Sequence, residues 1–297
     1  MSLSRILSAI VAIALALVMI VFGGWYFTIG LGIIIFLGQL EYFRLVRSKG
    51  IAPAAKTTLV LSQLLLITAA IAPTLTDAVF PLAGGLICFY LLFQPKLATI
   101  ADISTSILGL FYGAYLPSYW VRLRVGFTPE PLQASLDSIH LPLDGYWPQS
   151  WFDFTSFPEA LQVTFLAFGC IWAADIGAYI VGKFFGKIKL SKISPKKTVE
   201  GALFGILGSL LVADFGSWYL QWPYWGISGL LLGVLIGIVS LLGDLTESMM
   251  KRDAGVKDSG QLIPGHGGIL DRTDSYVFTA PLVYYYVVLF LPLLSKI

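Results

Sequence analysis

The segment that decides the fold is residues 224–251, YWGISGLLLGVLIGIVSLLGDLTESMMK. Its first part, 224–243, has no charged residue and is long enough to span a bilayer, which takes about 20 mostly apolar residues. In lipid a helix satisfies its own backbone hydrogen bonds, so this run predicts a membrane helix. Four polar side chains follow at i, i+3, i+4 and i+7, a spacing that places them on one helix face: Asp244, Glu247, Ser248 and Lys251.

This polar face has two interpretations. It is either a group of side chains that converge on one site, or a solvated amphipathic surface with Met249 and Met250 on its buried side. The segments on either side of it, described below, favour the first interpretation.

The composition of the whole chain indicates a membrane protein. Of its 297 residues, 57% are hydrophobic and 12% are charged, whereas soluble domains carry about 25% charged residues. The net charge of +2 gives no electrostatic support for nucleic-acid binding. Cys88 and Cys170 both lie in apolar runs, a pattern that indicates neither a metal site nor a disulfide framework.

Nine stretches satisfy the criterion for a spanning helix, so we predict an all-α, polytopic membrane helix bundle with about nine transmembrane helices. They cover residues 6–22, 25–43, 57–76, 78–93, 99–120, 160–182, 201–219, 224–243 and 275–293.

Lysine and arginine predict the orientation of this bundle. They gather in the loops after the even-numbered stretches, and cytoplasmic loops carry an excess of these residues. We therefore expect a cytoplasmic N-terminus and a C-terminus outside, in the cell inner (plasma) membrane or an equivalent membrane. Arg122 and Arg124 break the pattern, and we interpret them as long side chains that snorkel to the interface.

Carboxylates within apolar runs are the most informative residues. A charged side chain at the centre of a membrane helix costs about 2.5–3.5 kcal/mol on insertion scales, so it usually faces a polar cavity or a bound cation. Asp175, Asp244 and Asp271 are such residues, with Asp214 as a fourth. Each alone could be a helix cap or part of a structural ion pair. Together, beside two basic loops, they are better explained as ligands for Mg²⁺, which prefers one or two carboxylates plus substrate phosphates.

The first of these loops, 257–268, is rich in glycine. Gly267 and Gly268 permit backbone conformations closed to other residues and let N–H groups approach an anion. His266 could donate to a phosphate oxygen or act as an acid, although a lone histidine is more often structural. A flexible turn is the alternative, but it does not explain the acidic and basic residues at the start of the next helix.

The second loop, 182–201, is rich in lysine. Lysine suits a triphosphate because its ammonium group is a compact charge with three donors. Ser194 and Thr198 add hydroxyl groups, and either could cap the helix that follows. The alternative is a basic patch beside the membrane that binds anionic lipid.

These two segments resemble the signatures of the phosphatidate cytidylyltransferase family. The longer match is Ser248-x2-Lys251-Arg252-x4-Lys257-Asp258-x-Gly260-x2-Ile263-Pro264-x-His266-Gly267-Gly268-Ile269-Leu270-Asp271-Arg272-Thr273-Asp274. The other is Asp175-x2-Ala178-Tyr179-x2-Gly182-Lys183-x2-Gly186-Lys187, followed by Ile193-Ser194-Pro195-Lys196-Lys197-Thr198-x-Glu200-Gly201. The specific resemblance covers about 172–275, and the N-terminal half is similar only in being a series of spans.

The resemblance implies transfer of a cytidylyl group from CTP to phosphatidic acid in a membrane-embedded site open to the cytoplasm, with Mg²⁺ and with K⁺ as an accompanying ion. By position, Asp244 and Asp271 correspond to the family's metal ligands, and we add Asp175 as a further candidate. The chain then divides into 1–159, with the N-terminal transmembrane helices and an outer loop, and 160–297, the C-terminal catalytic transmembrane region with two cytoplasmic motif loops.

The other site residues are assigned by their chemistry. The catalytic candidates are Lys251, Arg252, His266 and Asp271. The candidates for substrate binding are Ser194, Lys196, Lys197, Thr198, Ser248, Lys257, Gly267, Gly268 and Arg272.

Two other functions stay open at this stage. A CTP-dependent polyprenol or lipid kinase would also use CTP in a membrane bundle, but would transfer the γ-phosphate. A cation-coupled transporter would explain the intramembrane Asp residues, but it predicts symmetry between the two halves of the chain, and the charged motifs occur once. The expected partners are CTP, phosphatidic acid and membrane lipid, without nucleic acid; a homodimer is one assembly that the sequence allows.

Overall fold

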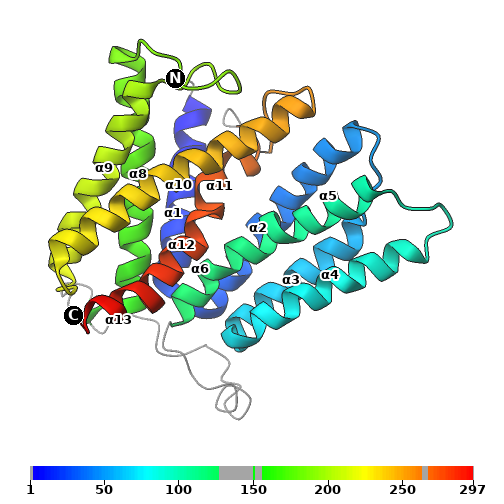
Figure 1. Ribbon diagram of the computed structural model, residues 1–297, viewed down its shortest axis with the longest axis horizontal. Coiled ribbons are helices and arrows are strands. Elements are labelled where there is room, and N and C mark those ends of the chain that lie inside the picture. Colours follow the sequence, from blue (N-terminus) through cyan, green and yellow to red (C-terminus); the bar gives the residue numbers. More distant parts are fainter. Residues whose placement is uncertain (1–2, 127–149, 151–155, 263–266, 297) are drawn as a thin grey trace.

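The computed structural model is a bundle of helices and describes residues 3–126, 150, 156–262 and 267–296 (Figure 1). Its first group is α1 (Leu3–Phe22), α2 (Gly24–Ser48), α3 (Ala55–Ile71), α4 (Thr76–Leu92), α5 (Ile100–Leu110) and α6 (Leu116–Val125). The rest is α8 (Glu159–Phe185), α9 (Val199–Tyr219), α10 (Trp225–Asp253), α11 (Leu270–Val277), α12 (Thr279–Tyr285) and α13 (Leu291–Leu294). A 3₁₀ turn at Pro73–Leu75 and π turns at Phe111–Tyr115 and Tyr286–Phe290 join neighbouring helices.

The predicted all-helical membrane class is confirmed. Within the described ranges, six helical stretches are long and apolar enough to cross a membrane: Gly24–Ser48, Pro73–Leu92, Glu159–Phe185, Val199–Tyr219, Trp225–Asp253 and Leu270–Leu294. Ile13–Phe22 and Ala55–Ile71 are shorter apolar helices. The predicted stretch 99–120 is divided by the π turn at Phe111–Tyr115. The count of nine spans and the orientation therefore stay predictions.

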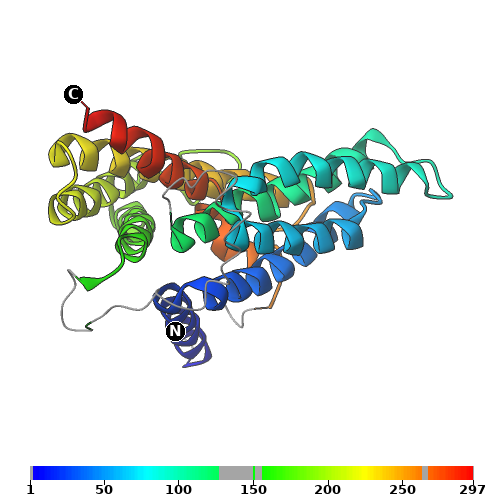
Figure 2. The ribbon, with the colours of Figure 1, turned by 90° about the horizontal axis from the view of Figure 1, so that it is seen from below.

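Helices α11 and α12 lie between the two groups of long helices. Figures 1 and 2 show them with α8, α9 and α10 on one side and α2 and α6 on the other. This arrangement brings the start of α11, where the longer signature segment ends, close to the N-terminal half of the chain.

Helix α10 extends well beyond the predicted end at residue 243 and stops at Asp253. Gly255 has a φ of 74°. Its N–H donates to the Arg252 carbonyl at 3.1 Å, and Val256 N donates to the Lys251 carbonyl at 2.9 Å. This is the hydrogen-bond pattern of a Schellman motif, which ends a helix at a left-handed glycine. The whole polar face that follows residue 243 is therefore helical.

Small residues allow α8, α9 and α10 to pack closely. A Cβ atom at Gly205 of α9 would lie 2.8 Å from the Ala174 carbonyl oxygen of α8, and one at Gly233 of α10 would overlap the Leu210 backbone of α9. Close approach through small residues is a usual way for membrane helices to associate. It fixes the position of α10 against the two helices that flank the lysine-rich loop.

Gly233→Ala is therefore expected to destabilise the bundle by about 1–3 kcal/mol, because backbone atoms of α9 would have to move. The matched control is Gly226→Ala in the same helix, where an added Cβ meets nothing within 4 Å. Thermal unfolding of the purified proteins in detergent measures the difference. Equal melting temperatures for the two variants would contradict this packing.

The snorkelling interpretation of Arg122 and Arg124 is wrong. Arg124 is fully buried, and its Nε and Nη2 donate to the Ile20 and Val21 carbonyls at 2.7 and 2.9 Å, at the end of α1. Arg122 is also buried and donates through Nη1 and Nη2 to Asp77 of α4 at 2.8 and 3.2 Å. These guanidinium groups donate to free helix carbonyls and to a carboxylate, which offsets part of the cost of burying them away from water.

Candidate active site

The crossing of α10 and α11 brings the signature residues together. A Cβ atom at Gly243 would lie 2.5 Å from the Asp274 carbonyl oxygen, so the two backbones nearly touch at this point. The polar side chains of α10 follow directly after Gly243, and those of α11 lie around Asp274. The close approach of α10 and α11 thus brings the polar side chains of the two helices into one site.

The predicted polar face of α10 is largely buried, and only Asp244, at its start, keeps about a third of its side chain exposed. Glu247, Ser248 and Lys251 have exposed fractions of 0%, 6% and 8%, and Met249 is 51% exposed. The amphipathic alternative required Met249 on the buried side. The structure therefore supports convergence of these side chains on one site.

Lys251 bridges two carboxylates at the centre of this site. Its Nζ lies 2.5 Å from Asp271 Oδ1 and also forms an ion pair with Glu247, one helical turn earlier on α10. A charged group in low dielectric is costly unless it is paired. The charge of Lys251 therefore stabilises both buried carboxylates, and a change in any of the three side chains affects the other two.

The second oxygen of Asp271 is held by the glycine-rich loop. Oδ2 accepts hydrogen bonds from Ser259 N and Ser259 Oγ, both at 3.0 Å, and from Gly268 N at 2.8 Å. Gly267 has a φ of 84°, and a Cβ atom there would lie 2.8 Å from the same oxygen. These glycines shape the loop around Asp271, and the predicted contact of Gly267 and Gly268 with a phosphate stays a prediction.

The lysine-rich loop meets α10 at Asp244. Lys197 Nζ lies 2.5 Å from Asp244 Oδ2, and Ser248 Oγ donates to Asp244 Oδ1 at 3.3 Å. The loop is held in place by an antiparallel bridge between Lys189 and Thr198. Asp244, four residues before the longer signature segment, therefore links Lys197 of one segment to Ser248 of the other.

Thr198 caps α9, as one of the two predicted alternatives stated. Its Oγ1 accepts a hydrogen bond from Gly201 N at 3.1 Å, which satisfies one of the free N–H groups at the helix start. Gly186 is required here, because a Cβ atom would lie 2.6 Å from Thr198 Cγ2. A role of Thr198 toward substrate stays a prediction beside this observed structural role.

Two further carboxylates lie close to the crossing. Asp175 of α8 accepts a hydrogen bond from Ser275 Oγ at 3.5 Å, and it is in electrostatic range of Asp244, Lys197 and Arg272. Asp274 is buried and in electrostatic range of Asp175, Asp244 and Glu247. Around the crossing, the Asp and Glu side chains therefore outnumber the Lys and Arg side chains. Such an excess of negative charge favours binding of an additional cation.

Among the described residues, no three Asp, Glu, His or Cys side chains form a ready metal cage. Mg²⁺ does not need one, since it keeps several waters and binds one or two carboxylates together with substrate phosphates. The crowded carboxylates around Asp244 are oxygen donors of the type that Mg²⁺ prefers, so the residues fit this ion. Asp214 does not belong to the group, because it lies about 22 Å along α9 from the helix start beside the lysine-rich loop.

The other predicted site residues have different positions. Arg252 donates from Nε to the Ile193 carbonyl at 3.3 Å and from Nη1 to the Val256 carbonyl at 2.8 Å, so it joins the two loops. The Ser194 carbonyl accepts a hydrogen bond from Lys197 N at 3.0 Å. His266 lies outside the described residues. The remaining cations are exposed: Lys196, Lys257 and Arg272.

The sequence interpretation missed Glu41 of α2. This carboxylate is 3% exposed and accepts hydrogen bonds from Ile269 N at 3.1 Å and Leu270 N at 2.9 Å, and Ser259 Oγ lies within hydrogen-bond distance of it, at 3.0 Å. A carboxylate within the predicted span 25–43 was the available signal, of the same kind that identified Asp175. Ser259 and Asp274 were also missed as site members, and Glu247 was placed on the polar face of α10 but given no role in the site.

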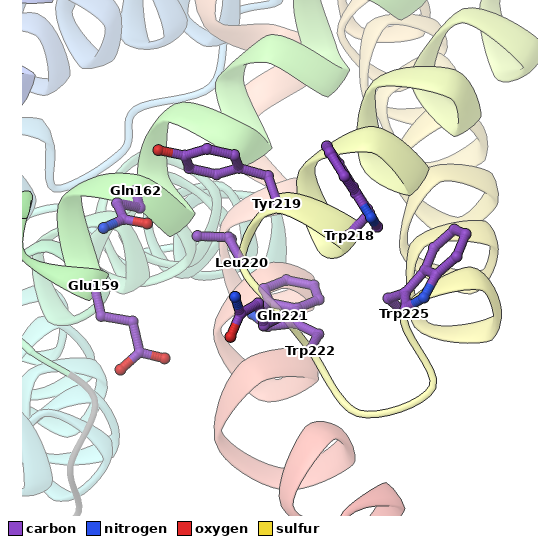
Figure 3. A pocket seen from close by; sticks show the side chains of 8 residues that line it. All are labelled: Glu159, Gln162, Trp218, Tyr219, Leu220, Gln221, Trp222 and Trp225. Carbon is purple, nitrogen blue, oxygen red and sulfur yellow. The ribbon is translucent and has the colours of Figure 1, made fainter. Parts of the chain in front are cut away.

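A separate cavity of about 760 Å³ lies at the other end of the long helices. Figure 3 shows its lining, with Glu159 at the start of α8 and Tyr219 at the end of α9. Trp225, at the start of α10, also lines it and is separated from Asp244 by about 28 Å along that helix. Its aromatic side chains suit a membrane interface. This cavity is therefore distinct from the cluster of signature residues.

Comparison with known proteins places the chain in a family. Residues 3–290 match the model of the "Cytidylyltransferase family". The phosphatidate cytidylyltransferase of Synechocystis sp. is 69% identical over 298 residues, covering 100% of both chains. Phosphatidate cytidylyltransferase 4, chloroplastic, of Arabidopsis thaliana is 41% identical over 272 residues, which cover 89% of this chain and 68% of the relative. The phosphatidate cytidylyltransferase of Bacillus subtilis is 47% identical over 131 residues, 43% of this chain and 49% of the relative. With a match that extends over nearly the whole chain, the protein belongs to the cytidylyltransferase family.

Proposed function

We propose that this protein transfers the cytidylyl group of CTP to phosphatidic acid, giving CDP-diacylglycerol and pyrophosphate for phospholipid biosynthesis. The observation that carries the proposal is the pair of lysine–aspartate contacts at one helix crossing, Lys197–Asp244 and Lys251–Asp271. The first ties Lys197 of one signature segment to the polar face of α10, and the second lies within the other segment, in a chain whose full-length relative is named phosphatidate cytidylyltransferase.

The reaction is a displacement at phosphorus. A phosphate oxygen of phosphatidic acid forms a bond to the α-phosphorus of CTP, and the bond from that phosphorus to the oxygen bridging to the β-phosphate breaks. The bond electrons leave with pyrophosphate. Since the attacking phosphate is already anionic near neutral pH, a strong general base is not required. The main barrier is repulsion between two anionic groups, which positioned cations lower.

The chain supplies such cations on both sides of the crossing. We assign Lys197 and Lys251 to the phosphates of CTP and to the departing pyrophosphate, with Arg272 beside them. Each lysine is held by a carboxylate, which orients its ammonium group in the site. A triphosphate would offer each of these lysines one more anionic partner.

Asp244 and Asp271 would hold Mg²⁺, with Asp175 near them and K⁺ as an accompanying ion. The bound Mg²⁺ would neutralise phosphate charge and favour in-line geometry. The role of the chain's own residues is to keep these oxygens in place: Ser259 and Gly268 hold Asp271, and Ser248 holds Asp244.

We infer that the two motif loops face the cytoplasm in the cell inner (plasma) membrane or an equivalent membrane, with about nine spans. Lys49, after α2, forms an ion pair with Asp253, at the end of α10, at 3.3 Å. This contact supports a common side for the loops after the second and eighth predicted spans. The acyl chains of the substrate would stay in lipid. We also propose that the protein forms a homodimer.

Labelled CTP tests the reaction. The purified full-length chain, given phosphatidic acid and Mg²⁺, is expected to transfer label from [α-³²P]CTP into lipid and to release label from [γ-³²P]CTP as pyrophosphate. Removal of divalent ions with EDTA is expected to stop the transfer, and added Mg²⁺ should restore it. Label from the γ-position in the lipid would instead identify a lipid kinase, and the absence of lipid label from either nucleotide would refute the proposal.

A further inference from the structure

Glu41 is a buried carboxylate that the mechanism above does not use. It belongs to α2, in the half of the chain where the sequence showed no specific signature, yet its side chain reaches the signature loop. Its Oε1 accepts from Ile269 N at 3.1 Å, and its Oε2 accepts from Leu270 N at 2.9 Å. Glu41 thereby binds the first N–H groups of α11, next to Asp271.

Ser259 connects Glu41 to Asp271. Its Oγ lies 3.0 Å from Glu41 Oε2 and 3.0 Å from Asp271 Oδ2. A serine hydroxyl has one proton to donate, so it can serve only one of these carboxylates at a time. Glu41 and Asp271 therefore share this hydroxyl, and a change at Glu41 alters a hydrogen bond available to Asp271.

Two glycines of the signature segment leave room for this carboxylate. A Cβ atom at Gly260 would overlap Glu41 Oε1, and one at Gly268 would overlap both Glu41 Oε2 and Ser259 Oγ. The loop backbone is thus moulded around Glu41, in addition to its contacts with Asp271.

We propose that Glu41 is a positioning residue for cytidylyl transfer, an inference that rests on the function proposed above. By holding Ser259 and the start of α11, Glu41 fixes the loop donors on Asp271 Oδ2 and leaves Oδ1 directed at Lys251. It acts through Asp271 and does not touch the reacting phosphates. Residues that orient metal-binding groups in this way typically contribute about 10- to 100-fold to activity or metal affinity.

The test is a double-mutant cycle with Glu41→Gln and Ser259→Ala. Glu41→Gln is expected to lower kcat by about 10- to 100-fold, because the amide offers one acceptor oxygen where the carboxylate offers two. The double variant should be less impaired than the product of the two single effects, since both changes remove the same hydrogen bond.

The matched control is Gln39→Met, two residues away in α2. Gln39 is also buried, and its Nε2 donates to Ser62 Oγ at 2.7 Å and to the Gly109 carbonyl at 2.9 Å, away from the signature loop. Its effect on kcat of the folded protein should stay within about two-fold and should multiply independently with Ser259→Ala. A parent-like kcat for Glu41→Gln, or independent effects in the Glu41–Ser259 cycle, would overturn the proposal.

Hydrogen exchange gives a readout that does not depend on activity. The amides of Ile269 and Leu270 are expected to exchange faster in Glu41→Gln and at the parent rate in Gln39→Met. Unchanged exchange in Glu41→Gln would refute positioning by Glu41. Failure of the parent protein to make CDP-diacylglycerol would instead refute the proposed function, so the two failures are distinguishable.

Discussion

Asp271→Asn is expected to leave a folded, membrane-inserted protein that has lost cytidylyl transfer by about 100-fold or more. The asparagine oxygen can still accept from Ser259 and Gly268, so the loop should keep its position. The amide nitrogen then faces Lys251 in place of the carboxylate oxygen that now lies 2.5 Å away. Since residues that merely orient a metal ligand contribute about 10- to 100-fold, loss of the proposed ligand itself should reach at least the upper value.

Steady-state transfer by the purified variant, normalised to monodisperse protein, measures this effect. The control is Asp214→Asn, the same chemical change in an intramembrane aspartate of α9 that lies far from the crossing. We expect parent-like turnover for the control. Turnover of Asp271→Asn near the parent rate would show that the metal assignment is wrong.

Lys251→Met is expected to abolish transfer and also to destabilise the protein by about 3–5 kcal/mol. Methionine has a similar length but no charge, so Glu247 and Asp271 would remain buried without their common cation. Breaking one side of a buried ion pair is costly for this reason. A decrease in the melting temperature in detergent, together with the transfer assay, measures the two effects.

A second substitution separates stability from catalysis. Adding Glu247→Gln to Lys251→Met removes one of the unpaired carboxylates, and we expect it to recover part of the lost stability without recovering transfer. Lys192→Met, at an exposed lysine of the other loop, should change neither property. Recovery of transfer in the double variant would contradict a direct role of Lys251 toward phosphate.

Local patterns predicted the residues that share one helix. The spacing of Asp244, Glu247, Ser248 and Lys251 placed them on one face because helical periodicity depends only on neighbouring positions. In the structure the last three of them are buried. The cap at Thr198 was likewise one of the local alternatives. Both predictions needed no knowledge of other helices.

Contacts between distant segments were not predictable in this way. The pairing of Lys197 with Asp244 depends on how the lysine-rich loop folds back over α10. Arg124 donates to carbonyls of α1, more than a hundred residues earlier, so its side chain was misassigned to the interface. Glu41 was missed for the same reason, because its partners lie in α11 and the loop before it.

The most direct test of the central claim is a cryo-electron microscopy structure of the full chain with Mg²⁺ and a CTP analogue that cannot be cleaved between the α- and β-phosphates. The account predicts density for the triphosphate at the crossing of α10 and α11, between Lys197 and Lys251 and beside Asp244 and Asp271. Nucleotide bound in the tryptophan-lined cavity at the opposite end of α10, with the crossing empty, would contradict it.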